Sequence, residues 1–328
     1  MAHTPRIGVF QGMRSCYCMW DLYLDRWERD MLVPAPPQYG AAAALTLPTV
    51  LAMGNHDGGA NDGARAYDGV FAPGARGAGA APWALANGDD DRYLPLFFAY
   101  FPQHTAAGLA PHGPADPGAA FAAGGGVPPP SWRLPYFEKR LGNATGATRL
   151  LFLDTGHVAR YAGAQRAWLA ARLPKGGSSA HGTVVGVYHV PIYSANMWTE
   201  RTSAGSALAR AHWLPLFDAY RAPRDKTGVA ASFEHHVHAF KRTAPMVAGK
   251  YRAAGTIYLG DGQMGNVGVP SDSAIARAKE THAKLLLEAQ NRYHVWRLDV
   301  DAARGGELEV RAIGLDGKVF DSVKRPVV

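Results

Sequence analysis

Three short segments of this 328-residue chain combine histidine with other polar side chains next to apolar stretches. They are residues 54–57 (Gly-Asn-His-Asp), 188–193 (Tyr-His-Val-Pro-Ile-Tyr) and 235–243 (His-His-Val-His-Ala-Phe-Lys-Arg-Thr). Imidazole nitrogens combined with amide and carboxylate oxygens suit zinc, manganese or iron as metal ligands. Taken alone, the first segment is also typical of an ordinary turn, because Asn, Asp and Gly favour turns for backbone reasons. The three segments together predict a metal site.

The elements that must position these side chains are indicated by apolar runs that end in polar residues. Residues 45–53 lead to Asn55, 150–153 to Asp154, 183–188 to His189, and 257–259 to Gly260 and Asp261. Runs of this length that are bounded by turn residues indicate buried strands. Because α/β folds bind ligands outside the carboxyl ends of their strands, we expect Asn55, His189 and the cluster of residues 234–238 to meet at one edge of a sheet. If the segment His236-x-His238 is extended, its imidazoles point to opposite sides and can serve two metals.

Helical periodicity between the strands indicates the fold class. Helices are predicted over residues 164–173, 207–220 and 273–290, and Pro215 should kink the second helix or mark its start. Two later segments, 294–300 and 307–313, alternate in polarity, and the pair Asp316-Gly317 predicts a hairpin. Strands that alternate with helices and then give way to a closing β segment predict an α/β sandwich.

Composition indicates how the chain is organised. A hydrophobic content of 47% is enough for a substantial core, and we expect a single domain over residues 1–328. Clusters of Ala, Gly and Pro break the pattern over residues 58–132. We expect a loop-rich and partly disordered insertion there, although residues 93–101 are aromatic enough to pack.

Charge and hydropathy limit the classes of partner. The net charge is +7 and the sequence pI is about 9.4, yet the basic residues are scattered without a compact run, so we expect no nucleic-acid partner. No uninterrupted apolar run reaches membrane-spanning length, so we expect no membrane partner. The first thirteen residues lack the apolar core of a signal peptide, and the localisation stays open. The oligomeric state is open as well. The two cysteines, Cys16 and Cys18, are too few for a structural zinc cage.

The chain resembles the calcineurin-like metallophosphoesterases, and among them the purple acid phosphatases. The likeness rests on four motifs in the family's order, GNHD (54–57), YHVPIY (188–193), HHVHAFKRT (235–243) and YLGDGQMG (258–265). This resemblance implies a two-sheet β-sandwich flanked by helices, a four-layer αββα arrangement. It also implies a metal-dependent phosphoric ester hydrolase that acts on a small phosphorylated substrate.

The resemblance assigns a role to each matching residue of the site. It implies that one metal ion is held by Asn55, His189 and His236. A second ion is held by His238, and Asp21 bridges both ions. His56 acts beside the leaving oxygen, either as an acid or by stabilising the transition state. The implied cofactors are two transition-metal ions of Fe, Zn or Mn. Two such ions clamp the phosphoryl oxygens and lower the pKa of a bound water, which attacks phosphorus in line.

The chain departs from the family pattern near its N-terminus. Residues 6–10 could form the first strand, but no acidic residue precedes Asp21, so one metal lacks a carboxylate ligand. Leu24 stands where the family has a metal-binding tyrosine. We therefore expect the N-terminal part to be eroded or truncated.

Two alternatives to a phosphomonoesterase follow from these departures. One is a catalytically impaired protein of the same fold that binds one metal or a phosphorylated ligand, and the other is a phosphodiesterase. Outside the metal site, Asp154 is expected to support the fold. Arg242 could contact phosphate, but a salt bridge at the rim is favoured for it.

Overall fold

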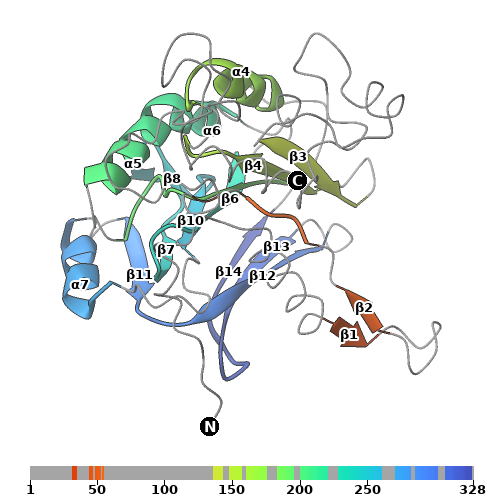
Figure 1. The fold of residues 1–328 in the computed structure, drawn as a ribbon, viewed down its shortest axis with the longest axis vertical. Helices are drawn as coiled ribbons and strands as arrows, with labels where there is room; N and C mark the ends of the chain where they lie inside the picture. The colour runs from red at the N-terminus through yellow and green to blue at the C-terminus, as the bar shows by residue number, and fades with distance from the viewer. Residues whose placement is uncertain are drawn as a thin grey trace, which may run out of the picture.

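A seven-stranded sheet forms the centre of the protein (Figure 1). The computed structural model describes residues 32–34, 44–46, 49–52, 54, 136–142, 148–156, 160–175, 183–195, 200–220, 228–260, 270–281, 285–301 and 307–326. In spatial order the strands are β11 (Leu286–Gln290), β7 (Phe240–Thr243), β10 (Ile257–Gly260), β6 (Val229–Glu234), β5 (Val184–Tyr188), β4 (Thr148–Leu153) and β3 (Phe137–Leu141). The four strands β4, β5, β6 and β10 are parallel neighbours, so their carboxyl ends lie at one edge of the sheet.

The apolar runs of the sequence form these central strands, as predicted for residues 150–153, 183–188 and 257–259. Strands that are covered on both faces read as continuous apolar runs, because neither face meets water. Gly186 of β5 allows the next strand to come close. A Cβ atom at Gly186 would lie 2.7 Å from the Ser232 Oγ of β6 and 3.2 Å from the ring of Tyr188.

Three helices cover one face of the sheet, namely α4 (Gly163–Arg172), α5 (Glu200–His212) and α6 (Leu214–Ala219) (Figure 1). Their buried side chains, which include Trp168 of α4 and Phe217 of α6, form one core cluster with Trp213, between α5 and α6, and with Tyr188 of the sheet. The helix predicted over residues 164–173 is confirmed by α4. The helix predicted over 207–220 is two helices, since Pro215 lies in the first turn of α6, where its missing N–H costs no hydrogen bond.

The long helix predicted over residues 273–290 is wrong in its second half. The helix α7 (Asp272–Thr281) ends early, and strand β11 follows it. Residues 285–290 are good helix formers by composition, but β11 pairs antiparallel with β7 and completes that edge of the sheet. Tertiary pairing here overrides a weak local propensity.

A second sheet of three antiparallel strands faces the first one (Figure 1). It consists of β12 (His294–Asp301), β13 (Glu307–Gly314) and β14 (Val319–Pro326). The predicted strands at 294–300 and 307–313 are confirmed, as is the hairpin, in which Gly317 adopts φ +72°. Apolar residues of the two sheets share one core cluster, for example Val185 and Ile257 with Leu308 and Val310. The protein therefore has a mixed α/β fold with a large sheet packed against a smaller one.

The predicted fourth, helical layer is not found in the part of the chain that the structure describes, where α4 to α6 cover the large sheet and α7 packs on β11.

Two small antiparallel pairs complete the fold, β1 (Leu32–Pro34) with β2 (Ala44–Thr46), and β8 (Met246–Val247) with β9 (Lys250–Tyr251). The strand predicted over residues 45–53 is wrong in extent, since β2 ends at Thr46 and residues 49–52 form no regular element. A proline at position 48 of the sequence does not favour a longer strand, because proline cannot donate a ladder hydrogen bond.

The predictions for residues 6–10 and for the insertion at 58–132 lie outside the described residues. Among the helices that the structure describes, none is long and apolar enough to cross a membrane.

Candidate functional site

Two of the predicted metal ligands meet at the carboxyl edge of the large sheet. His189 follows β5 directly, and His236 lies two residues after the end of the adjacent parallel strand β6. The Nδ1 atom of His236 lies 3.0 Å from the Nε2 atom of His189. The two rings are 4.9 Å apart and meet edge to face at 75°. Parallel pairing of β5 with β6 thus brings together two histidines that are 47 residues apart in the chain.

The backbone also joins the two histidine-bearing connections. The amide N–H groups of His235 and His236 both donate to the carbonyl oxygen of His189, at 3.0 and 2.9 Å. Between His236 and His238, the side chain of Val237 is buried in an apolar cluster with Ile275 of α7. The helix α7 therefore packs against the connection through Val237, while the imidazoles of His236 and His238 remain partly exposed.

The connection after β5, residues 189–193, is held by side chains from several elements. The amide of Val190 donates to Thr155 Oγ1 at 3.2 Å. From α5, the hydroxyl of Ser206 donates to the Pro191 carbonyl, and Arg210 Nη1 donates to the Ile192 carbonyl at 2.6 Å. These hydrogen bonds fix an irregular segment that is largely buried and whose polar groups water cannot satisfy.

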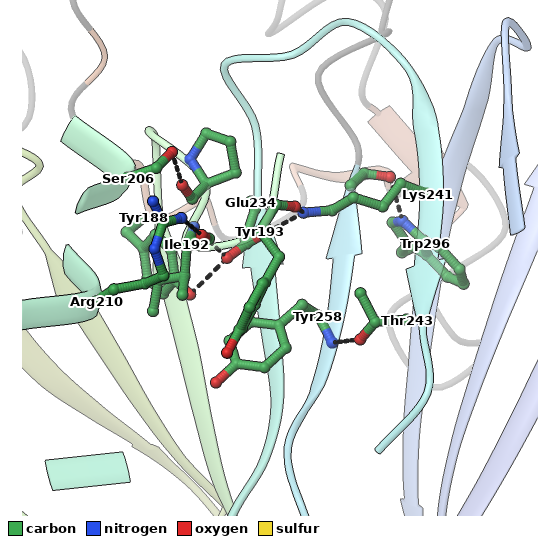
Figure 2. Close-up of polar contacts among 12 residues, drawn as sticks. Tyr188, Ile192, Tyr193, Ser206, Arg210, Glu234, Lys241, Thr243, Tyr258 and Trp296 are labelled. Atoms are coloured by element: carbon green, nitrogen blue, oxygen red, sulfur yellow. Dashed lines mark hydrogen bonds and ion pairs between the residues drawn. The ribbon is translucent and has the colours of Figure 1, made fainter. Parts of the chain in front are cut away.

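A buried carboxylate connects this segment to the next strand (Figure 2). Glu234, the last residue of β6, accepts hydrogen bonds at Oε1 from the Tyr188 hydroxyl at 2.8 Å and from the Ile192 amide at 2.7 Å. Its Oε2 atom forms an ion pair with Lys241 Nζ, which also donates to the Tyr193 carbonyl. Burial, together with the nearby Glu234 charge, raises the pKa of Tyr188 well above its usual value, so the phenol keeps its proton and acts as a donor.

The end of β10 is held from the second sheet. The carbonyl oxygen of Gly260 accepts from His294 Nε2 and from Trp296 Nε1, both at 2.9 Å. Figure 2 shows Trp296 reaching across from the second sheet to make this bond. The edge of the large sheet that carries His189 and His236 is therefore also tied to the smaller sheet.

Asp154 and Arg242 have structural roles, as predicted, but the salt bridge of Arg242 is mostly buried between the two sheets and not at the rim. The buried Asp154 exchanges backbone hydrogen bonds with the side chain of Gln165, at 2.8 and 2.9 Å, which joins β4 to α4. Arg242 of β7 forms a two-pronged salt bridge with Asp321 of β14, at 2.6 and 2.8 Å.

Of the four remaining predicted site residues, the structure describes His238. His238 lies in the same connection as His236 and is partly buried. Asp21, Asn55 and His56 lie outside the described residues, although Gly54, directly before Asn55, is described and buried. Within the described ranges, no group of three or more His, Cys, Asp or Glu side chains could hold a metal ion, so His238 does not complete such a group with the other two histidines.

Sequence reasoning named Glu234 only as part of the histidine-rich cluster at a strand end, and gave no role to Lys241. The available signal was their position, because the two charged residues flank the His-x-His segment and Glu234 directly follows the apolar run 229–233. A carboxylate at the end of a buried strand must find partners, since buried charges are almost always paired.

Comparisons with known proteins do not assign the chain to a family. No family model matches the chain. No curated protein matches it either. Among solved structures, it is similar to a purple acid phosphatase, PPD1, isolated from yellow lupin (Lupinus luteus) seeds, with 16% identity, 58% of this chain covered and a TM-score of 0.37. The match spans about a third of that protein's chain (32%). A likeness at this level does not assign a family or an activity.

Proposed function

We propose that this chain is a metal-dependent phosphoric ester hydrolase whose reaction centre lies at the carboxyl ends of β5 and β6. The observation that carries the proposal is the 3.0 Å approach of His189 Nε2 and His236 Nδ1. The sequence motifs around Asn55, His189 and His236 add support, because they match the phosphoesterase pattern in the same order along the chain.

The geometry of the two imidazoles fits a shared metal ion. Zinc–nitrogen bonds are about 2.0–2.1 Å long, so two of them that meet at about 90–110° place their nitrogens about 2.8–3.4 Å apart. The measured separation of 3.0 Å agrees with that range. Without metal, one ring can donate its N–H to the lone pair of the other, so a proton and a metal ion compete for the same space.

The proposed ligand set extends the histidine pair with the residues named from the sequence. Asn55 would join His189 and His236 at one ion of Fe, Zn or Mn, His238 would hold a second such ion, and Asp21 would be a ligand of both. A bound ion of this kind supplies Lewis-acid polarisation of a phosphoryl oxygen and a water of lowered pKa. His56 would place its proton at the leaving oxygen, where negative charge develops.

The substrate class is proposed as a small phosphate ester. A net charge of +7 favours anionic ligands in general, without selecting between a monoester and a diester. A second candidate function is a protein of this fold that binds one metal or a phosphorylated ligand without turnover. It is favoured by Leu24, which stands where the phosphoesterase pattern has a metal-binding tyrosine and so removes a ligand from one of the two ions.

Metal content and turnover test the proposal together. Purified protein is loaded with Mn²⁺, Zn²⁺ or Fe, its metal is counted by elemental analysis, and hydrolysis of p-nitrophenyl phosphate and of bis-p-nitrophenyl phosphate is measured. We expect turnover of the monoester with two ions per chain. Folded protein that holds metal but hydrolyses neither ester would overturn the enzymatic proposal, and one ion per chain would favour the second candidate.

Variants of single histidines locate the site. We expect His189→Ala and His236→Ala to abolish tight metal binding, because each removes one of two neighbouring ligands. His212→Ala, at the end of α5, is the matched control and should bind metal as the wild type does. Equal metal binding by all three variants would show that the ion lies elsewhere.

A further inference from the structure

An ion pair of unusual burial lies beneath the two histidine-bearing connections. The side chain of Glu234 is 0% exposed and that of Lys241 is 3% exposed. Removing two charges from water is costly, and well-packed apolar residues in place of a buried ion pair are often as stable or more stable. A contribution to folding stability alone therefore does not explain why this pair is charged.

The contacts of the pair connect the two segments that carry the histidines (Figure 2). Along the chain, Glu234 and Lys241 lie seven residues apart and flank His236 and His238. In space, Glu234 bonds to residues on both sides of His189, namely the Tyr188 hydroxyl and the Ile192 amide. Lys241 Nζ then donates to the carbonyl of the next residue, Tyr193.

These contacts fix one connection relative to the other. The Tyr188 hydroxyl and the Ile192 amide hold the segment of His189 on Glu234, and Glu234 is only two residues before His236. Lys241 closes the arrangement, because its Nζ atom bonds to both Glu234 and Tyr193. A shift of either connection would have to break a bond to a fully buried charge, which is more costly than breaking a bond at the surface.

We propose that Glu234 and Lys241 are positioning residues that hold His189 and His236 at the spacing for a shared metal ion before the ion arrives. This inference rests on the proposed function, because it takes the two histidines as metal ligands. Ligands must be held close to their bound geometry for tight binding, and groups that orient ligands without touching the metal commonly change affinity by about 10- to 100-fold. Both side chains are buried and therefore not available to contact a substrate, so neither is proposed as a catalytic residue.

Two substitutions test the pair, with Co²⁺ as the probe. Glu234→Gln keeps the size of the side chain but removes its charge, and Lys241→Met keeps much of the length of the lysine without its charge. Each variant is measured for the urea dependence of unfolding, for Co²⁺ affinity of the folded protein, and for the visible absorption spectrum of bound Co²⁺. We expect both variants to lose about tenfold or more in Co²⁺ affinity and to change the Co²⁺ spectrum.

A second buried ion pair provides the matched control. Glu138 of β3 and Arg149 of β4 have side chains that are 7% and 4% exposed. Arg149 lies near the start of β4, whereas His189 and His236 follow the carboxyl ends of β5 and β6. Glu138→Gln should lower stability as Glu234→Gln does, yet leave Co²⁺ affinity and spectrum unchanged. The double variant Glu234→Gln/Lys241→Met should lose less affinity than the two single losses combined, because it leaves no unpaired buried charge.

The outcomes separate this inference from the proposed function. If folded Glu234→Gln and Lys241→Met bind Co²⁺ within twofold of the wild type, the positioning role is overturned while the metal site stands. If the wild type binds no Co²⁺, the metal site and the positioning role both fall. If the wild type binds Co²⁺ but hydrolyses no ester, catalysis fails while the positioning role is still decided by affinity.

A milder variant keeps the test decisive if Glu234→Gln does not fold. Tyr188→Phe removes only the hydroxyl that donates to Glu234 and preserves the apolar ring in the core. We expect a loss of Co²⁺ affinity of about threefold or more, smaller than for Glu234→Gln because the Ile192 amide still holds the carboxylate. Wild-type affinity in this variant and in Lys241→Met would overturn the inference.

Discussion

The salt bridge between Arg242 and Asp321 joins the two sheets, and its removal should cost stability without affecting substrate binding. The side chains are only 16% and 13% exposed, and two parallel N–H···O bonds of 2.6 and 2.8 Å connect them. Hydrogen bonds to charged groups contribute about 1.5–3 kcal/mol when buried, whereas exposed ion pairs contribute about 0.2–1 kcal/mol. For this mostly buried pair we expect a coupling energy of about 1–2 kcal/mol.

A double-mutant cycle measures this energy. The variants Arg242→Met, Asp321→Asn and the double variant are unfolded in urea. The coupling energy is the amount by which the two single losses in unfolding free energy, added together, exceed the loss in the double variant. An exposed pair of the same residue types serves as the control. Arg297 and Asp299 of β12 are 2.9 Å apart with side chains 59% and 33% exposed, so their coupling should be about 0.5 kcal/mol or less.

Kinetics distinguish this role from contact with phosphate. If Arg242 only joins the sheets, Arg242→Met leaves KM for p-nitrophenyl phosphate within about twofold while it lowers the free energy of unfolding. Strictly additive losses in the cycle, or a large rise in KM with little change in stability, would refute the structural role of Arg242.

Three further changes test the packing and charge of the described core. Gly186→Ala should lower the free energy of unfolding by about 1–2 kcal/mol, because its Cβ would lie 2.7 Å from Ser232 Oγ, and the loss should shrink in a Ser232→Ala background. Trp213→Phe should cost about 2–4 kcal/mol in urea unfolding, since Trp213 is fully buried and its indole donates to a buried carbonyl, which the variant leaves without a donor; an unchanged midpoint would contradict this. Burial raises the pKa of Glu138, but its bonds with Arg149 and Arg140 outweigh burial, and the net effect is a lowered pKa. The ionised Glu138 therefore stabilises the folded protein above the unfolded pKa of about 4.3, and this stabilisation is lost as the pH falls through the lower pKa of the folded state. Stability of Glu138→Gln, measured from pH 7 to 3, should therefore fall less steeply than that of the wild type, and parallel curves would argue against it.

The sequence predicted the central strands and the meeting of His189 with His236, because both follow from simple rules. Buried strands leave continuous apolar runs, and parallel neighbours end at the same edge of a sheet. Helix α4 was equally readable from its periodicity. A salt bridge of Arg242 was also predicted, but at the rim and not between the two sheets, where the structure has it.

Other features depend on tertiary contacts that no local pattern reveals. Strand β11 reads as helix by composition, and only its pairing with β7 makes it a strand. The link from Glu234 to Ile192 spans 42 residues and involves a backbone amide, which leaves no trace in side-chain identity. The assignments of Asp21, Asn55 and His56 remain predictions, because these residues lie outside the described ranges.

The hydrogen bonds at the carbonyl of Gly260 have a mechanical consequence. His294 and Trp296 both belong to β12, so the smaller sheet is attached to the last residue of β10, next to the strand that leads to the histidines. The smaller sheet cannot slide along the larger one without pulling on this strand end. Heating that loosens the contact between the sheets should then distort the histidine edge while the helices are still intact. The close approach of His189 and His236 would then be lost by a local shear before the protein loses its helical content.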